Sequence, residues 1–145
     1  HFKLNAMKIQ LAASDEDILK CREVILELRP HLKEENFVFI TRRMFSEGTK
    51  MVFIEENGRA VAAGVFRINY YYHRGKNIYI DDLTTLPESR SKGYGKKILD
   101  WIKQYGIDHE VANIHLDSGT HRVGAHKLYL NYGFKITSFH FAMDL

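Results

Sequence analysis

The stretch TLPESRSKGYGKKI (residues 85–98) places two glycines, one arginine and three lysines between a proline and an apolar run. This composition is typical of a helix start that binds an anion, because the first N–H groups of a helix have no partner within it. Glycines at positions 93 and 95 let a ligand approach the backbone. Taken alone, the stretch also fits an ordinary solvated turn with surface lysines. The positive charge beside free amides favours a pyrophosphate site.

Two common phosphate-binding patterns are excluded by the spacing. The P-loop requires G-x-x-x-x-G-K-[ST], which the chain lacks. The dinucleotide fingerprint G-x-G-x-x-G requires a third glycine at the position where this chain has Ile98. The pattern that remains is R-x-x-G-x-G, from Arg90 to Gly95.

The composition indicates a soluble globular protein of 145 residues, with 45% hydrophobic and 27% charged residues. This length fits one domain, which we place at residues 7–145. We expect residues 1–6 (HFKLNA) to be a remnant of cloning. The chain shows neither an apolar run long enough for a membrane span nor a signal peptide, so we expect a cytoplasmic protein without a membrane partner. The net charge of +3 is too small to indicate a nucleic-acid partner, and the single cysteine excludes an internal disulfide.

The spacing of the apolar residues predicts the order strand, helix, helix, three strands, helix, strand, helix and a C-terminal strand region. Asn57 and Gly58 form a strong hairpin signal, because both tolerate the positive φ of a two-residue turn. Strand–helix–strand units in the second half require parallel neighbours, so the fold class is α/β with a mixed sheet. The expected strands cover residues 8–12, 51–54, 60–71, 78–83, 111–116 and, in two short pieces, 134–145. The expected helices contain residues 18–28, 37–44, 98–105 and 125–132.

Two segments of the chain resemble the GCN5-related N-acetyltransferase (GNAT) family. IYIDDLTTLPESRSKGYGKKILDWI (residues 78–102) is similar to the family's acyl-CoA-binding motif, which has an acidic strand, a proline, R-x-x-G-x-G and a helix. HLDSGTHRVGAHKLYLNYGF (residues 115–134) is similar to its second half, where a helix reads A-x-x-x-Y-x-x-x-G-F. Residues 8–71 agree with the family only in the order of elements. The resemblance implies a mixed, mostly antiparallel sheet with a splayed central strand pair, flanked by helices on both faces.

The resemblance implies an enzyme that transfers an acetyl group from acetyl-CoA, its co-substrate, directly to a primary amine without a metal. In the family, the pantetheine arm lies in the gap beside the motif strand and pairs with its backbone. The pyrophosphate lies on the amides of the glycine-rich turn. β-propensity alone also explains the two threonines of the strand. The cofactor-binding positions that the resemblance assigns are Leu83, Thr84, Thr85, Arg90, Ser91, Lys92, Gly93, Tyr94, Gly95 and Lys96.

The resemblance also implies three catalytic residues. A protonated amine needs a base before it attacks, directly or through water, and a departing thiolate needs an acid. Asp81 matches the acidic position named as the base in similar polyamine enzymes, and Asp82 is the second candidate. Successive strand residues face opposite sides, so only one of the two faces the cleft unless a bulge intervenes. Tyr129 matches the family's proton donor, although packing also explains its helical spacing.

The amine acceptor is not specified by the sequence. The architecture of the family places it near residues 29–36 and 70–72, where three tyrosines suit either a cationic amine or a strand edge. A small-molecule amine and a peptide amine both fit. Many relatives carry an asparagine where this chain has Arg122, which suits a phosphate or solvent. The resemblance also leaves room for a homodimer through the C-terminal strands.

Two other functions fit parts of the pattern. A non-catalytic acyl-CoA sensor or partner module would share the fold and bind the cofactor without transferring the acetyl group. A nucleic-acid-binding domain would use the basic turn at residues 90–97, but the modest net charge and the lack of a second basic face argue against it. Asp81, Asp82 and Tyr129 favour the enzyme.

Overall fold

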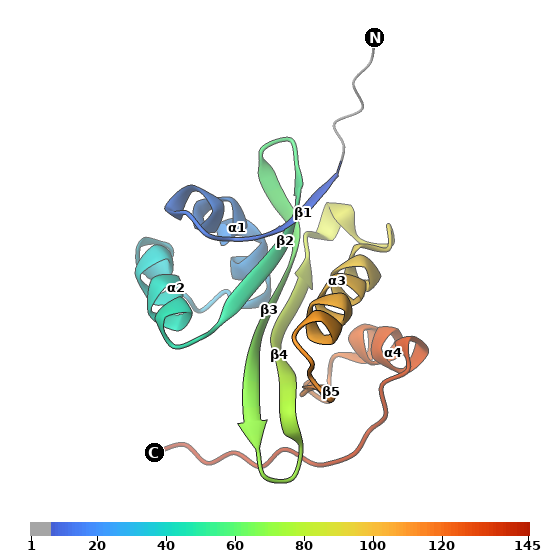
Figure 1. Ribbon diagram of the computed structural model, residues 1–145. Coiled ribbons are helices and arrows are strands. Elements are labelled where there is room, and N and C mark those ends of the chain that lie inside the picture. Colours follow the sequence, from blue (N-terminus) through green and yellow to red (C-terminus); the bar gives the residue numbers. More distant parts are fainter. Residues whose placement is uncertain (1–6) are drawn as a thin grey trace.

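The computed structural model describes residues 7–145, so the expected cloning remnant at residues 1–6 lies outside the described part of the chain. One strand and two helices come first, three consecutive strands follow, and a helix, a strand and a helix complete the order (Figure 1). The strands are β1 (Lys8–Leu11), β2 (Lys50–Glu56), β3 (Arg59–Tyr71), β4 (Gly75–Thr85) and β5 (Asn113–Leu116). The α-helices are α1 (Asp15–Leu28), α2 (Phe37–Ser46), α3 (Tyr94–Asp108) and α4 (Val123–Tyr132), and the short 3-10 helices are η1 (Glu34–Asn36) and η2 (Pro87–Ser89).

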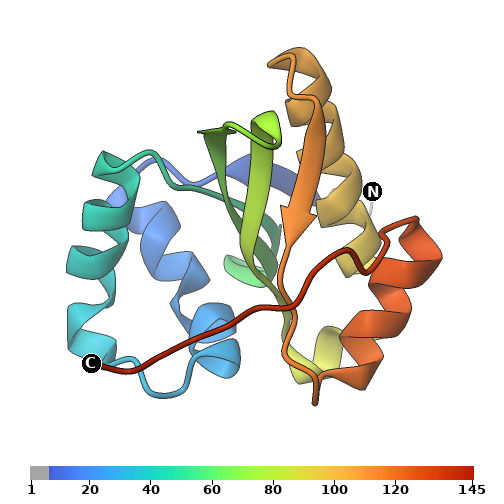
Figure 2. The same cartoon turned by 90° about the horizontal axis from the view of Figure 1, so that it is seen from below.

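The five strands form one sheet in the order β1-β2-β3-β4-β5. All neighbours are antiparallel except β4 and β5, which are parallel, as the strand–helix–strand pattern predicts. Helices α1 and α2 cover one face of the sheet, and α3 and α4 cover the other (Figures 1 and 2). The predicted mixed, mostly antiparallel sheet between two helical layers is therefore confirmed.

Local signals fix the ends of the elements that lead to the site. The Oγ of Ser14 accepts a hydrogen bond from the Asp17 N–H at 3.1 Å, while Oδ2 of Asp17 accepts one from the Ser14 N–H at 3.3 Å. This capping box starts α1, and the helix then ends at Leu28, one residue before Arg29. The β2–β3 hairpin turns through the predicted Asn-Gly pair, with φ of 52° and 80°.

The core lies where α1 and α3 press on the central strands. The largest fully buried side chains include Phe53, Phe66 and Ile98, from β2, β3 and α3. Helix α3 packs unusually close to β3, because a Cβ at Gly64 would lie only 2.6 Å from Cγ2 of Ile98. This contact holds α3 against the strands that carry the candidate site.

The C-terminal region differs from the sequence-based expectation. Residues 134–145 were expected to form two short strands, but they form no strand in the structure. The segment instead runs below the sheet, away from α4 (Figure 2). Its apolar side chains remain exposed, with 82% for Ile136, 87% for Phe139 and 91% for Phe141. The alternating apolar pattern shows that the segment can pair, but a strand also needs a partner, and residues 134–145 pair with none of the described strands.

None of the helices within residues 7–145 combines the length and the apolar character needed to cross a membrane.

Candidate functional site

The gap between β4 and β5 is the first feature of the site. The two strands pair only from Asn77 opposite Asn113 to Ile80 opposite Leu116, and β4 then continues alone on that side through residues 81–85. On its other side this part of β4 stays paired with β3. Backbone groups that face the gap therefore lack a strand partner and are available to a ligand. The expected splay of the central strand pair is confirmed.

Leu83, Thr84 and Thr85 lie on the part of β4 that has no partner on the β5 side. Their pairing partners on β3 are residues 62–64. The hydroxyl of Thr84 is buried and donates to the carbonyl oxygen of Val24 in α1 at 3.2 Å. Its side chain is thus committed to the core, which leaves only the backbone of Thr84 for a ligand.

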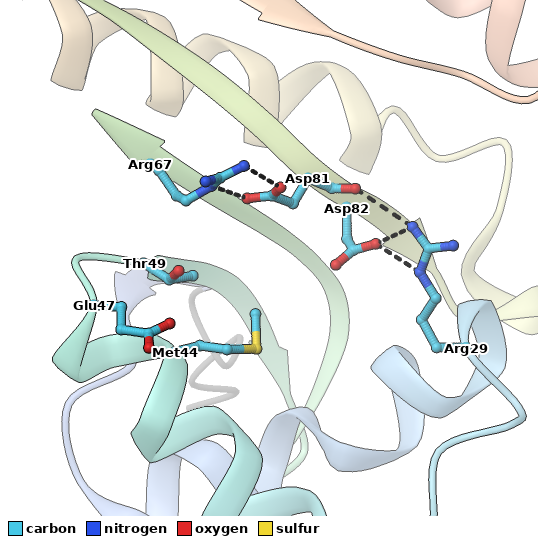
Figure 3. A pocket seen from close by; sticks show the side chains of 7 residues that line it. All are labelled: Arg29, Met44, Glu47, Thr49, Arg67, Asp81 and Asp82. Carbon is cyan, nitrogen blue, oxygen red and sulfur yellow. Dashed lines mark hydrogen bonds and ion pairs between the residues drawn. The ribbon is translucent and has the colours of Figure 1, made fainter. Parts of the chain in front are cut away.

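A β-bulge brings both candidate acids to the same side of the sheet. Val65 pairs with Asp82, and the next residue, Phe66, pairs with Ile80, so Asp81 is an extra residue in β4. Strict alternation would have sent one carboxylate away from the cleft. Because of the bulge, Asp81 and Asp82 line the same cavity (Figure 3).

That cavity, which we call the first cavity, has a volume of about 390 Å³. Five separate segments of the chain supply its wall: the ends of α1 and α2, the residue before β2, and strands β3 and β4. Its lining consists of Arg29, Met44, Glu47, Thr49, Arg67, Asp81 and Asp82. The sequence pointed to Arg29, Asp81 and Asp82, but nothing in it indicated the other four.

Each aspartate is held by one arginine. The guanidinium of Arg67 donates from Nε and Nη2 to the two carboxylate oxygens of Asp81, at 2.9 and 3.0 Å. Arg29 donates from Nε and Nη2 to a single oxygen of Asp82, Oδ1, at 2.8 and 2.5 Å. The two carboxylates therefore differ: both oxygens of Asp81 are engaged, whereas Oδ2 of Asp82 makes no hydrogen bond within the described residues.

A second cavity of about 230 Å³ opens on the other side of these aspartates, toward β5 and α4. It shares Arg29, Asp81 and Asp82 with the first cavity, so these three residues form the wall between the two spaces. The rest of its lining is Leu28, Ile80, Leu83, Leu116, Asp117, Ser118, Gly119, His121, Arg122 and Tyr129. The gap between β4 and β5 and the Tyr129 side chain thus face one space.

Tyr129 combines burial with access to the second cavity. Its ring packs edge-on against Phe134, with centroids 5.8 Å apart. Burial is the main cause that raises the pKa of Tyr129, the charge of Asp82 raises it further, and Arg122 opposes both. The phenol therefore keeps its proton at neutral pH, as a proton donor must. Packing and proton donation are compatible at this position.

The glycine-rich turn adopts the backbone shape that its sequence predicts. Gly93 is the N-cap of α3 with a left-handed φ of 79°, and Ser91 has a positive φ of 64°. The first helical bond runs from the Lys97 N–H to the Gly93 oxygen, so the three preceding N–H groups have no acceptor within the helix. Alternating φ signs followed by free helical N–H groups are the backbone pattern found in concave anion sites.

The side chains of the turn offer an anion fewer fixed donor groups than its backbone does. Tyr94 points away, since its hydroxyl hydrogen-bonds Glu56 at the end of β2. Gly95 leaves room for α4, because a Cβ there would lie 3.0 Å from Cδ2 of Leu128. The cationic groups of Arg90 and Lys96 approach Glu27 at 3.6 Å and Asp100 at 3.2 Å, and both side chains are largely exposed. Lys92 is exposed as well.

The structure also places Arg122 and the tyrosines at positions 70–72, which the sequence linked to the site. Arg122 lies in the second cavity rather than at a remote surface. The tyrosines at positions 70–72 lie at the far end of β3, where Tyr72 is fully exposed, and they line neither cavity. Within residues 7–145 no group of three His, Cys, Asp or Glu side chains has the arrangement of a metal site.

Comparisons with known proteins agree with this geometry. The family model described as "Acetyltransferase (GNAT) family" matches residues 16–134. The uncharacterized N-acetyltransferase YhdJ of Bacillus subtilis (strain 168) is 31% identical over 132 residues, which are 88% of this chain and 92% of that protein. The thialysine N-epsilon-acetyltransferase of Bos taurus is 30% identical over 56 residues, 39% of this chain and 33% of that protein. The structure of AAC(6')-Iy in complex with a CoA bisubstrate analog has a TM-score of 0.83 at 14% identity, covering 97% of this chain and 99% of that one.

Proposed function

Because the chain belongs to the GNAT family of acetyltransferases and is an acetyl-CoA-dependent N-acyltransferase, we propose that it transfers the acetyl group directly to an amine held in the first cavity. The observation that carries this proposal is the shared wall of Arg29, Asp81 and Asp82 between two cavities. A thioester in the second cavity and an amine in the first would meet at this wall. Direct transfer needs such an arrangement, since both reactants must be held within reach of each other.

The cofactor would lie along the second cavity and the glycine-rich turn. The amides of the pantetheine arm would pair with the backbone of Leu83, Thr84 and Thr85, where β4 has no neighbour on the β5 side. The pyrophosphate would accept hydrogen bonds from the N–H groups of residues 91–96, with Arg90 and Lys92 beside it. Acetyl-CoA acts as co-substrate, and the transfer chemistry needs no metal.

Asp82 is the better placed of the two acids for the role of base. Both oxygens of Asp81 accept hydrogen bonds from Arg67, whereas Oδ2 of Asp82 is free to accept one more. The side chain of Asp82 is also the less exposed, at 13% against 27% for Asp81. Aspartate is short, so we place a water between Oδ2 and the ammonium group of the acceptor. Asp81, which the sequence placed first, then fixes Arg67 and becomes the second candidate for the base.

The proposed steps balance in atoms and charge. A proton of the acceptor ammonium passes through water to Oδ2 of Asp82. The freed nitrogen attacks the thioester carbonyl carbon, the new C–N bond forms, and the C–S bond breaks. The departing CoA thiolate takes the hydroxyl proton of Tyr129, which its raised pKa has kept in place. The new amide nitrogen then loses its second proton through water to the Tyr129 phenolate, and Asp82 returns its proton to solvent when the products leave. Each proton transfer of this kind is worth roughly 10²–10⁴-fold in rate.

The acceptor that fits best is a small-molecule amine. The first cavity, at about 390 Å³, has the size of a small-ligand site. Two similar proteins point the same way, since one is a thialysine N-epsilon-acetyltransferase and the other, AAC(6')-Iy, is an aminoglycoside N-acetyltransferase.

The proposal is tested by calorimetric titration of the chain with acetyl-CoA, followed by thiol release with a panel of amines. We expect binding of acetyl-CoA, no binding of NADH, and thiol release with at least one amine. The Tyr129→Phe variant should keep acetyl-CoA binding and lose most of its turnover. Binding without thiol release to any amine would favour the alternative of a non-catalytic acyl-CoA module. Unchanged turnover of Tyr129→Phe at all pH values would remove Tyr129 from the mechanism.

The proposal includes a homodimer through the C-terminal segment, residues 134–145. The support is the exposure of its apolar side chains and the position of β5 as an edge strand of the described sheet. Light scattering after size exclusion should give the mass of a dimer, and the double variant Phe139→Ser/Phe141→Ser should give that of a monomer. A monomeric parent chain would contradict this part of the proposal.

A further inference from the structure

The first cavity has an unusual balance of charge. Five of its seven lining residues carry a formal charge: Arg29, Glu47, Arg67, Asp81 and Asp82. A pocket for a polyamine or another multiply charged cation would need several free carboxylates. Here each acid already faces an arginine, because Glu47 accepts from the neighbouring Arg43 at 3.0 Å, in addition to the two aspartate pairs. Two carboxylate oxygens of the lining make no hydrogen bond within the described residues, Oδ2 of Asp82 and Oε2 of Glu47. The Asp82 side chain is only 13% exposed against 61% for Glu47, so Oδ2 of Asp82 is the oxygen that we assign to a single ammonium group.

Arg67 is held as a fixed cation in the wall of this cavity. Its bidentate contact with Asp81 sets the plane of the guanidinium, and its Cζ lies 5.5 Å from the centroid of the Tyr79 ring. Hydrogen bonding to Asp81 raises the pKa of Arg67, so the side chain stays charged at every pH of interest. The guanidinium is thus positioned before any ligand arrives, which lowers the entropy cost of binding.

The guanidinium of Arg67 still has hydrogen-bonding capacity. Its contacts run through Nε and Nη2, and within the described residues Nη1 makes none. Arg67 remains 39% exposed and lines the cavity. An ion pair that only joins β3 to β4 can be buried completely. The Arg67 side chain instead stays partly exposed in the lining of the cavity proposed for the acceptor. A planar donor group of this kind suits a carboxylate.

We propose that Arg67 is a specificity-determining residue that binds a carboxylate of the acceptor, so that the preferred substrate is an amino acid or another small amine with a carboxylate. The ammonium group would bind at Oδ2 of Asp82 and the carboxylate at Nη1 of Arg67, on one side of the same wall. This assignment rests on the proposed acetyl transfer and names the substrate class for it. It follows from the pairing of the acids and the free donor in one cavity.

Matched substrate pairs test the assignment. Lysine and cadaverine differ only by the carboxylate, and so do alanine and ethylamine; the first pair has a distal amine and the second an adjacent one. In the parent chain we expect kcat/KM to be at least about 10-fold higher for the carboxylate-bearing member of one pair, as a hydrogen bond to a charged group provides. Arg67→Gln should reduce this ratio to near one. Arg67→Lys should restore part of it, because the charge returns without the planar fork.

A control variant separates specificity from a structural effect. Arg22→Gln removes an arginine of nearly equal exposure, 38% against 39%, that pairs with Glu34 at 3.2 Å outside both cavities. It should leave the ratio unchanged. Acetyl-CoA titration and thermal unfolding of Arg67→Gln report whether that variant keeps its fold and cofactor site. A structural role of Arg67 would lower kcat/KM for both members of a pair by the same factor and leave the ratio where it was.

The two levels of the proposal fail in different ways. A preference for the member without the carboxylate, an unchanged ratio in Arg67→Gln, or turnover confined to amines without a carboxylate would overturn the role of Arg67 and leave acetyl transfer intact. Absence of thiol release with every amine, despite acetyl-CoA binding, would overturn the proposed function itself.

Discussion

The two sides of the wall formed by Arg29, Asp81 and Asp82 are built in different ways. On the cofactor side, the structure offers backbone: the unpaired edge of β4 and the free N–H groups at the start of α3. On the acceptor side, it offers side chains from five separate segments, held in ion pairs. Backbone groups are the same in every protein of this fold, whereas side chains can change one at a time. Under the proposed function, the cofactor that the family shares is bound by backbone groups, and the acceptor, which varies, is bound by side chains.

The strongest test of this comparison is at the wall itself. Asp82→Asn removes the proposed base and should lower kcat by about 10²–10⁴-fold while acetyl-CoA still binds, because the cofactor side is made of backbone. Asp81→Asn should have a smaller effect, since both oxygens of Asp81 are already engaged by Arg67. Steady-state kinetics with the best amine and calorimetry with acetyl-CoA give both quantities. The reverse order of the two variants would make Asp81 the base.

The backbone of residues 85–98 could be predicted from the sequence because its information is local. Residues 85–98 are contiguous, and Gly93 at the N-cap of α3 and the free amides after it follow from glycine, proline and apolar spacing alone. The hairpin at Asn57 and the parallel β4–β5 pair were also predicted correctly. In each case a short stretch of chain determines its own conformation.

The acceptor side could not be predicted because it depends on distant contacts. Arg67 reaches Asp81 only because a bulge shifts the register of β3 and β4, and no turn residue or glycine marks that bulge in the sequence. The C-terminal strands were predicted wrongly for a related reason. The alternation of apolar residues from Ile136 onward describes the segment itself, but pairing also requires a free neighbour in the right place.

A second test changes the backbone of the cofactor side without changing its charge. Gly93→Ala places a side chain on a residue with φ of 79°, where an L-residue costs roughly 1–2 kcal/mol. We expect a loss of about this free energy of unfolding and weaker binding of acetyl-CoA. The free energy is measured by urea unfolding and the affinity by calorimetry.

Gly124→Ala provides the matched control for that variant. Gly124 lies in the first turn of α4, its φ is not positive, and an added Cβ would meet no atom within 4 Å. Alanine should therefore be neutral or slightly stabilising there. Equal effects of the two substitutions would show that the conformation of Gly93 is not what the site requires.

A third, smaller effect is expected for the charges of the turn. Arg90 is largely exposed and shares its charge with Glu27 at 3.6 Å, so Arg90→Gln should weaken acetyl-CoA binding by only about 2- to 5-fold. The difference from the parent chain should shrink at high salt, because exposed charges are screened. Calorimetry at low and high ionic strength measures this. A loss far above that range would mean that the pyrophosphate is held by side chains rather than by amides, and the comparison between the two sides would no longer hold.

The smallest expected effect separates the burial of Tyr129 from its chemistry. Burial raises the pKa of this phenol above its usual value of about 10, so the folded state keeps the proton that the unfolded chain releases. The stability that Tyr129 contributes is therefore fully present below pH 10 and is lost as pH rises from there toward the folded pKa.

Tyr129→Phe has no proton to release, and its free energy of unfolding should fall less between pH 9 and pH 11 in urea titrations. Only part of the alkaline slope can disappear, because burial raises the pKa of Tyr79 and Tyr132 too. If instead Tyr129→Phe and the exposed control Tyr70→Phe had the same slope as the parent chain, the phenol would be solvated in solution. The second cavity would then be open to water at the point where the thiolate is proposed to leave.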